Sequence, residues 1–395
     1  MKRSFFAILF LVIVGVLFYF IKDYLFYDIS LRGVVPAIRP PGKDIKQYMP
    51  QGYQLNFPLS ISKGFQIGVF ADLKANLPRV IVLDPSDTLV VSSTNKGKIF
   101  ALPDKDINGK VDEIKEIIGG LNKPHGIAFA EGKIYIAETD KVTRWDYNST
   151  DFTVSSPEVL FNLPGGGRHF TRTIAVSGNK LYTSVGSSCD VCEENDEKRA
   201  SILVSDLDGS NLKTFAKGLR NTVFFAFDDE GVLWGTDMGR DNLGDNLPPD
   251  EVNIIKEGKD YGWPYCYGDR VRDSKFKPGE KVTYCTQTEA PVYNLPAHVA
   301  PLGIVFINSA IFPSSDDGSL LIAEHGSWNS SQPVGYKISK LSVLGGSVGT
   351  YSNFINGWLQ KDEALGRPVG LVFDGAGKLF ISDDKAGLIY ILSRI

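Results

Sequence analysis

The feature that most constrains the fold is a sequence unit that recurs six times along the chain. Each unit holds a short apolar segment, a turn that contains Gly or Asp, and a second apolar segment, as in PHGIAFAEGKIYIAE. The first four units begin 46, 48 and 49 residues apart. A period of this length, built from strands, is typical of a β-propeller or β-solenoid, in which each small sheet buries its faces against its neighbours. The units begin at Pro78, Pro124, Arg172, Asn221, Pro301 and Arg367.

A third strand follows within each unit, in segments such as GKIFALP and EVNIIKEG. The last such segment, GLIYILS, ends the chain, and another strand-like segment, FQIGVFA, precedes the first unit. Terminal segments that share one blade close a propeller into a ring and remove exposed sheet edges. We therefore expect an all-β, six-bladed β-propeller over residues 51–395, with the extra length of the fourth and fifth units in loops.

The N-terminus differs from the rest of the chain. Two basic residues precede an unbroken apolar run from Phe5 to Ile21, which is near the lower length limit of a spanning helix. We predict a transmembrane signal anchor in residues 1–27 and a linker in residues 28–50. The basic flank favours a cytoplasmic N-terminus, so the propeller would lie on the periplasmic or extracellular side of the cell membrane. A cleaved signal peptide is the alternative, and it also exports the domain.

The charge of the chain argues against one class of partner. The formal net charge is −4, and the sequence contains no stripe of Lys and Arg that could track a phosphate backbone. We therefore expect no nucleic-acid partner.

The four cysteines fit an exported protein. Cys189 and Cys192 form a C-x-x-C pair in a polar stretch, and Cys266 and Cys285 bracket a loop of a size that disulfides commonly close. We predict two disulfides, Cys189–Cys192 and Cys266–Cys285. A zinc site is an alternative, but the two pairs differ in spacing and have no His at zinc-finger spacing. A thioredoxin-like redox role is a second alternative, although no βαβ pattern surrounds the C-x-x-C pair.

One histidine has the surroundings that a catalytic base needs. His169 lies in the run PGGGRHFTRT, where three glycines leave room for a flat ligand. Arg168 and Arg172 would favour the neutral, proton-accepting imidazole through like-charge repulsion. The other three histidines, His125, His298 and His325, also lie near the ends of repeat strands, and each could instead be structural.

Two further groups of residues could bind an anionic ligand and a cation. The segment 236–253, TDMGRDNLGDNLPPDEVN, is rich in carboxylates and glycines that suit a hard cation, although a solvated acidic loop is an open alternative. Arg220 with Asn221, and Arg367, each open a repeat strand. They would therefore point to the same face of a propeller and could pair with planar carboxylates.

Taken together, these motifs resemble one known family. The chain from about residue 64 to its end is similar to the sugar dehydrogenases that depend on pyrroloquinoline quinone (PQQ), especially the sorbosone and pyranose dehydrogenase branch, and is related to soluble quinoprotein glucose dehydrogenases. The stretches that carry the resemblance are KPHGIAF, GRHFTRTIA, LYTSVGSSCDVC, GLRNTVF, GRDNLGDNLPPDEVN, YGWPYCYG, AEHGSWNSS with PVGYK, and GRPVGLVFD.

The resemblance implies roles for particular residues. His169 stands where the family has its general base. Residues that match the family's PQQ-binding positions are Arg220, Asn221, Arg367, His325 and Trp328. Backbone carbonyls of Gly239 and Arg240 match ligands of the calcium ion bound to the cofactor, and Glu251 with the Tyr261 carbonyl match a second, structural calcium site. The implied reaction is oxidation of a sugar or related aldose or aldehyde by hydride transfer to calcium-bound PQQ.

The resemblance also leaves alternatives open. Arg168 replaces an acidic residue that precedes the catalytic histidine in the soluble glucose dehydrogenases, so glucose is a doubtful substrate. Electrons would pass from the cofactor to a membrane quinone or a cytochrome. A calcium-dependent propeller lactonase and a non-catalytic propeller that binds a glycan or protein are the competing interpretations. In the lactonase, acidic side chains would have to converge from several blades, whereas here they cluster in one loop.

Overall fold

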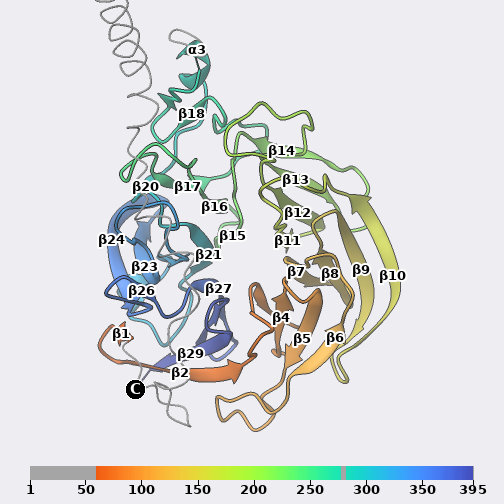
Figure 1. Cartoon of the computed structure of the whole chain (residues 1–395). Helices are drawn as coiled ribbons and strands as arrows, with labels where there is room; N and C mark the ends of the chain where they lie inside the picture. The colour runs from red at the N-terminus through yellow and green to blue at the C-terminus, as the bar shows by residue number, and fades with distance from the viewer. Residues whose placement is uncertain (1–58, 277–281, 395) are drawn as a thin grey trace, which may run out of the picture.

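The computed structural model describes residues 59–276 and 282–394, which form a ring of six antiparallel sheets around a central axis (Figure 1). The predicted anchor, the linker and the first residues of the predicted propeller domain lie outside the described residues. Within the described part of the chain, helices are too short or too polar to cross a membrane.

Blades 1 to 3 follow one another along the chain, and each contains four strands in sequence order. Their innermost strands are β3, β7 and β11. Blade 1 comprises β3 (Ile81–Leu83), β4 (Leu89–Ser93), β5 (Lys98–Leu102) and β6 (Lys115–Ile118). Blade 2 comprises β7 (Ile127–Ala130), β8 (Lys133–Ala137), β9 (Lys141–Asn148) and β10 (Thr153–Asn162). Blade 3 comprises β11 (Ile174–Ser177), β12 (Lys180–Val185), β13 (Ser201–Asp206) and β14 (Lys213–Lys217).

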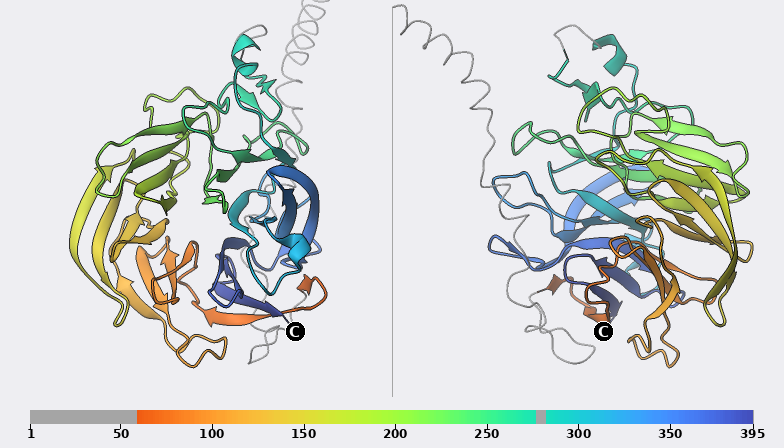
Figure 2. Two further views of the ribbon diagram at one scale, coloured as in Figure 1. Left: turned by 180° about the vertical axis from the view of Figure 1, so that it is seen from behind. Right: turned by 45° about the vertical axis from the view of Figure 1, so that its right-hand side comes forward.

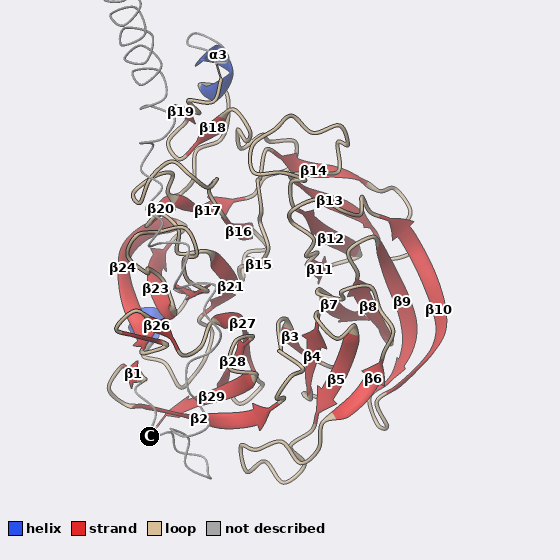
Figure 3. Cartoon of the chain, viewed as in Figure 1, coloured by secondary structure: helices blue, strands red, loops and turns tan. Residues whose placement is uncertain are grey.

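Blades 4 and 5 carry the expected extra length in loops. Blade 4 comprises β15 (Phe225–Phe227), β16 (Leu233–Asp237), β17 (Asp250–Ile254) and β20 (Tyr293–Leu295). Between β17 and β20, the strands β18 (Cys266–Tyr267) and β19 (Val271–Arg272) and the helix α3 (Val282–Cys285) project outside the ring (Figure 3). Blade 5 comprises β21 (Pro301–Phe306), β22 (Leu320–Glu324), β23 (Lys337–Leu344), β24 (Ser347–Asn356) and the short edge strand β1 (Ser60–Ile61), with a 3-10 turn η2 (Ser314–Asp316).

Blade 6 closes the ring with strands from both ends of the described chain. It comprises β27 (Pro368–Phe373), β28 (Leu379–Asp383), β29 (Leu388–Arg394) and β2 (Phe65–Asp72), and a hairpin of β25 (Leu359–Gln360) and β26 (Glu363–Ala364) precedes it. The outermost strand β2 pairs antiparallel with β29 from Phe65 opposite Arg394 to Asp72 opposite Leu388. Figure 2 shows this closure from behind. The prediction that FQIGVFA and GLIYILS share one blade is confirmed.

The fourth strand of each of the first five blades was not predicted from the sequence. The unassigned strands β6, β10, β14, β20 and β24 are short or carry many exposed residues, so their apolar pattern is weak; β10 is mostly exposed. An outer strand has few neighbours to bury it, which removes the alternation that predicts a strand.

The apolar core lies between neighbouring blades and around the axis. Val80, Val223, Phe224, Leu302 and Val369 form one buried cluster at the starts of the innermost strands of four blades. Chain packing there is so tight that a Cβ on Gly303 would lie 2.2 Å from the carbonyl oxygen of Val369. These contacts fix the position of each blade relative to the axis, and with it the loops at the ends of the strands.

Candidate active site

The loops at one end of the propeller hold most of the predicted site residues. Because strands alternate in direction, the residues before an innermost strand and those after the second strand of a blade meet at the same face. Arg220 and Asn221 precede β15, and Gly239 follows β16. His169 lies in the loop before β11, and Trp328 lies in the loop after β22. The structure therefore brings residues from three blades to one face.

A cavity of about 230 Å³ opens on this face between blades 3, 4 and 5. Five of the predicted residues line it, together with Arg168 and Asp241; the predicted ones are His169, Arg220, Asn221, Gly239 and Trp328. His298 lines it as well. We call this space the His169 cavity.

The surroundings of His169 keep its imidazole neutral and fix its orientation. The His169 Nδ1 atom lies 3.0 Å from the carbonyl oxygen and 2.9 Å from the hydroxyl oxygen of Ser187. The Ser187 hydroxyl donates to the carbonyl of Cys189 at 2.7 Å, so the hydroxyl oxygen and the carbonyl oxygen of Ser187 can both accept from Nδ1–H. Burial, with the positive charges of Arg220 and Arg168, lowers the pKa of His169 to about 3. Nε2 then carries the lone pair that a general base requires.

A close approach places Asn221 beside His169. A Cβ on Gly186 would lie 2.7 Å from both the His169 Cβ and the Asn221 Oδ1, so only glycine lets the two side chains sit this close without a shift. The backbone N–H of Asn221 donates to Asp237 Oδ1 at 2.7 Å. Its side-chain amide donates to the Met238 sulfur at 3.3 Å, a weak acceptor that leaves the amide available to a ligand.

Arg220 is held firmly by the protein itself. Nε donates to the Asp190 carbonyl at 3.0 Å, Nη1 donates to the Met238 carbonyl at 3.2 Å, and Nη2 donates to Asp190 Oδ1 at 2.7 Å. Nη2 also lies 3.4 Å from Asp241 Oδ2. A guanidinium has five N–H groups, so these contacts leave one N–H of Nη1 without an acceptor among the described residues.

Arg367 and His325 form a separate network between blades 5 and 6. Arg367 donates from Nη1 to His325 Nδ1 at 3.2 Å and from Nη2 to the Tyr336 hydroxyl at 3.0 Å. His325 must therefore carry its proton on Nε2, which donates to Asp384 Oδ1 at 2.8 Å. Neither Arg367 nor His325 lines the His169 cavity. Trp328 does line it, and its ring lies 5.5 Å from the Arg168 guanidinium.

The four predicted metal ligands surround a single small void. Gly239, Arg240, Glu251 and Tyr261 all line a space of about 20 Å³, enough for one water-sized particle. Asp237 lines it too. The resemblance implied two calcium sites, whereas in the described structure these residues gather at one void, and Gly239 also borders the His169 cavity.

The charge around this void fits a hard cation. Burial raises the pKa of Glu251 to about 8 and of Asp237 to about 6, and it raises the pKa of Asp250, which lines the His169 cavity, to about 7. Glu251 accepts from the Gly268 N–H at 2.7 Å and from the Asn253 amide at 3.1 Å, and none of the described ion pairs includes Glu251. Buried carboxylates without a cation are costly, and carboxylates with carbonyl oxygens are what Ca²⁺ prefers.

A second cavity on the same face was not predicted from the sequence. Its volume is about 330 Å³, and it is bordered by blades 6, 1 and 2 and by the loop of blade 3 that carries His169. Phe170 lines it, adjacent in sequence to His169, and its side chain is 37% exposed. Lys123 lies over the Phe170 ring at 4.5 Å. An exposed aromatic residue directly after a histidine is the signal that could have found this site. We call this space the Phe170 cavity.

Two other features lie away from the site. A hollow of about 690 Å³ lies beside the β5–β6 loop, and none of the predicted site residues lines it. In the same loop Asp104, Asp106 and Asp112 come within metal-binding distance of one another, but two of the three are exposed and such clusters are common without an ion.

The remaining histidines are structural in character. His125 is fully buried, its Nδ1 lies 3.1 Å from the Thr173 hydroxyl, and its ring packs edge-on against Phe224. His298 donates from Nε2 to the Gly244 carbonyl at 2.7 Å. His125 lines neither cavity, and the Nε2 of His298 is bound to a backbone carbonyl. His169, whose Nε2 makes no hydrogen bond to the described residues, is therefore the histidine best placed to act as a base.

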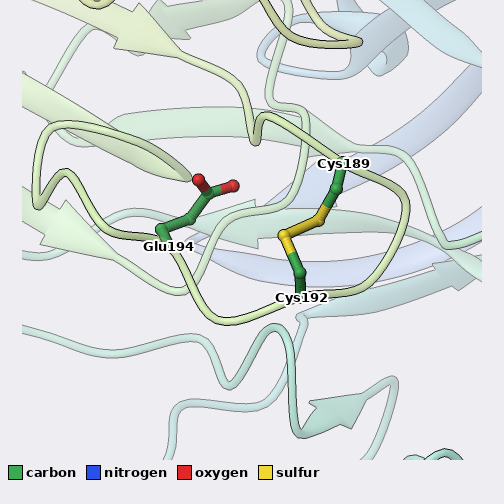
Figure 4. A group of neighbouring side chains, drawn as sticks. All are labelled: Cys189, Cys192 and Glu194. Carbon is green, nitrogen blue, oxygen red and sulfur yellow. A yellow bond between two sulfur atoms is a disulfide. The ribbon is translucent and has the colours of Figure 1, made fainter.

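Both predicted disulfides are present, Cys189–Cys192 and Cys266–Cys285, and none of the cysteines is free. The first lies in the loop after β12 (Figure 4). The zinc and thioredoxin-like alternatives for these cysteines are not supported.

Comparison with known proteins places the chain in a family. The TrAA12-like family model matches residues 59–395. An uncharacterized protein of Borreliella burgdorferi is 33% identical over 356 residues, which cover 85% of this chain and 91% of that protein. The pyrroloquinoline quinone-dependent pyranose dehydrogenase of Coprinopsis cinerea is 26% identical over 88% of this chain, and the match spans only 56% of that enzyme.

A solved structure shares the fold. The holo form of the PQQ domain of Coprinopsis cinerea pyranose dehydrogenase superimposes with a TM-score of 0.76 at 24% identity, and the match covers 87% of this chain and 99% of that domain. The family match and the shared fold agree with the motifs read from the sequence. The chain therefore belongs to the TrAA12-like family, a family of PQQ-dependent sugar dehydrogenases.

Proposed function

We propose that this protein oxidises a hydroxyl group of a sugar, of the pyranose, aldose or sorbosone type, with PQQ as cofactor and His169 as general base. The observation that carries the proposal is the state of His169. Its imidazole is held neutral at the edge of a cavity lined by Arg220 and Asn221, with Nδ1–H bound to Ser187 and Nε2 left to accept a proton.

The residues present fit PQQ in the His169 cavity. Arg220 offers a fixed positive charge and one free N–H, and the Asn221 amide offers a donor that has only a sulfur partner in the protein. Trp328 offers an aromatic surface at the rim. When bound, the quinone supplies the acceptor for the hydride that leaves the sugar carbon. Arg367 and His325, the other two residues that the resemblance assigned to the cofactor, would support the site from the adjoining blades.

The protein's part in the reaction is proton transfer and orientation. His169 Nε2 would accept the hydroxyl proton of the sugar, and the Ser187 carbonyl would stabilise the resulting imidazolium by accepting from its Nδ1–H. Arg168 and Arg220 lower the pKa of His169, so the base is available at neutral pH. The Phe170 cavity lies beside the base and could hold the rest of the sugar, with the Phe170 ring against its apolar face.

Calcium would bind beside the cofactor site. Glu251, with the backbone of Gly239, Arg240 and Tyr261, would supply oxygen ligands at the void of about 20 Å³. A cation there would compensate the buried carboxylates Asp237 and Glu251, whose pKa values burial raises.

We also propose that the propeller is exported and anchored to the cell membrane by residues 1–27. The support is the apolar run from Phe5 to Ile21 and the two disulfides, which form in oxidising compartments. An anchored enzyme could pass its electrons to a membrane quinone or a cytochrome. Sequencing the mature N-terminus would test the anchor, because a start at or beyond residue 22 would show cleavage.

One experiment tests the proposed function directly. The full-length protein is mixed with PQQ and Ca²⁺, and the absorbance of the bound quinone is followed while candidate sugars are added. We expect a sugar to bleach this absorbance, and His169→Ala to slow the bleaching by about 10²–10⁴ while PQQ still binds. If a sugar bleaches the absorbance of His169→Ala at the wild-type rate, another residue is the base. If the wild-type protein does not bind PQQ, the proposed function is wrong.

A further inference from the structure

The loop that follows β12 has little regular structure but touches the centre of the candidate site. Residues 186–200, between β12 and β13, contain neither helix nor strand. Within this segment Asp190 contacts Arg220 from two sides: its carbonyl accepts from Nε at 3.0 Å, and its Oδ1 accepts from Nη2 at 2.7 Å. Asp190 therefore fixes both the position and the rotation of the guanidinium.

The same carboxylate links Arg220 to the loop after β16. Asp190 Oδ1 also accepts the backbone N–H of Asp241 at 2.9 Å, and Asp241 Oδ2 lies 3.4 Å from Arg220 Nη2. Asp190 is thus the point where loops of blades 3 and 4 meet at the wall of the His169 cavity. A change in its position would move Arg220 and the Asp241 loop together.

The Cys189–Cys192 disulfide holds Asp190 in place. The bridge spans three residues of sequence and encloses Asp190, so it restricts the backbone on both sides of that residue. Figure 4 shows Glu194 beside the bridge; its carboxylate accepts the Ser188 N–H at 2.6 Å and the Ser188 hydroxyl at 2.8 Å. Hydrogen bonds from Trp263, Tyr265 and Lys275 also reach the loop, at Asp190, Glu193 and Val191. Without the bridge, hydrogen bonds such as these would have to offset a larger conformational entropy of the loop.

We propose that Asp190, constrained by the Cys189–Cys192 disulfide, is a positioning residue that keeps Arg220 oriented for cofactor binding. The expected consequence is that opening this disulfide weakens PQQ binding, and this consequence rests on the proposed function. Arg220 is the residue that contacts the cofactor, and Asp190 acts through it. The disulfide is then part of the cofactor site as well as of the fold.

The test compares four full-length proteins: the wild type, the double variant Cys189→Ser with Cys192→Ser, Asp190→Glu, and the matched control Asp196→Glu. Asp190→Glu keeps the charge and changes only the reach of the carboxylate. Asp196 lies in the same loop and is exposed, and its carboxylate accepts from the Lys198 N–H rather than from Arg220. Thermal unfolding is measured for each protein, and Asp190→Glu still tests the proposal if the double cysteine variant does not fold.

Two readouts are taken. The first is hydrogen exchange of the Arg220 Nε–H, measured by NMR without PQQ. We expect at least tenfold faster exchange in the double cysteine variant, because the backbone carbonyl of Asp190 that accepts this N–H loses its constraint. We expect the same in Asp190→Glu, because a longer carboxylate displaces the guanidinium that Oδ1 holds through Nη2, and we expect unchanged exchange in Asp196→Glu. The second is the Kd for PQQ in the presence of Ca²⁺. We expect it to rise about tenfold or more in the same two proteins, in keeping with the loss of hydrogen bonds that orient a charged group.

The outcomes separate this inference from the proposed function. If wild-type protein binds no PQQ, the proposed function is wrong, and the exchange measurement still decides whether Asp190 positions Arg220. If exchange and Kd in the double cysteine variant equal those of the wild type, the positioning role is overturned. Combining the cysteine changes with Asp190→Glu should add little to either change alone, since both act through Asp190, and full additivity would contradict the shared route.

Discussion

The protonation state of His169 offers a direct test of the site. The structure lowers the pKa of this imidazole to about 3, through burial and through the charges of Arg220 and Arg168. At pH 5 such a group is about 1% protonated, whereas an ordinary histidine with a pKa of about 6.5 is about 97% protonated. We therefore expect His169 to remain neutral between pH 8 and pH 5 in the protein without PQQ.

NMR of ¹⁵N-labelled histidine measures this state, because the chain has only four histidines. The His169 signals, identified by their loss in His169→Gln, should keep the shifts of a neutral ring with its proton on Nδ1. That tautomer follows from the Ser187 carbonyl 3.0 Å from Nδ1. A titration with a midpoint near 6.5 would refute the proposed environment, and a proton on Nε2 would refute the orientation.

The same pKa has a consequence for stability. Below pH 6.5 the unfolded chain binds a proton at this position and the folded protein does not, so the free energy of unfolding falls as pH falls toward 3. For a change from about 6.5 to about 3, the loss at pH 5 is about 2 kcal/mol, and at pH 8 it is near zero. Denaturant unfolding of wild type and His169→Gln should show this difference. Parallel pH dependences in the two proteins would contradict it.

Three further predictions concern the metal void, the Phe170 cavity and Gly186, which lies against His169. Ca²⁺ should raise the melting temperature of the wild type and a chelator should lower it, and Glu251→Gln should remove most of this shift because it deletes a charged oxygen ligand. Phe170→Ala should raise KM for the sugar about three- to tenfold without changing the Kd for PQQ, whereas the exposed control Val159→Ala should change neither; an unchanged KM would exclude the Phe170 cavity as a sugar site. Gly186→Ala should slow cofactor reduction at least tenfold, because its Cβ would lie 2.7 Å from the Cβ of His169, and stopped-flow rates equal to wild type would show that this close approach is unimportant.

The sequence determined the fold because the information is local and repeated. Each blade is signalled by a short strand, a turn and a second strand within one unit, and the ring follows because such sheets must cover one another's faces. Both disulfides could also be predicted from spacing and export. Outer strands such as β10 were missed because their exposed side chains carry no alternating pattern.

The sequence also identified which residues reach the face that holds the site. Arg220, Asn221 and Arg367 were predicted to reach one face, and the resemblance added His169. The structure places His169, Arg220 and Asn221 at one cavity, which Arg367 does not line. The shared face was predictable because residues that flank the inner strands of a propeller must meet at its ends, regardless of where their side chains point.

What the tertiary structure alone decided is which partner each of those side chains takes. The long side chain of Arg220 is bound to Asp190, and that of Arg367 is bound to His325 on the neighbouring blade. These pairs join segments of different blades, and no spacing in the sequence specifies which of several nearby groups a flexible side chain will meet. The Phe170 cavity has the same origin, because an enclosed space exists only once separate blades have packed around it.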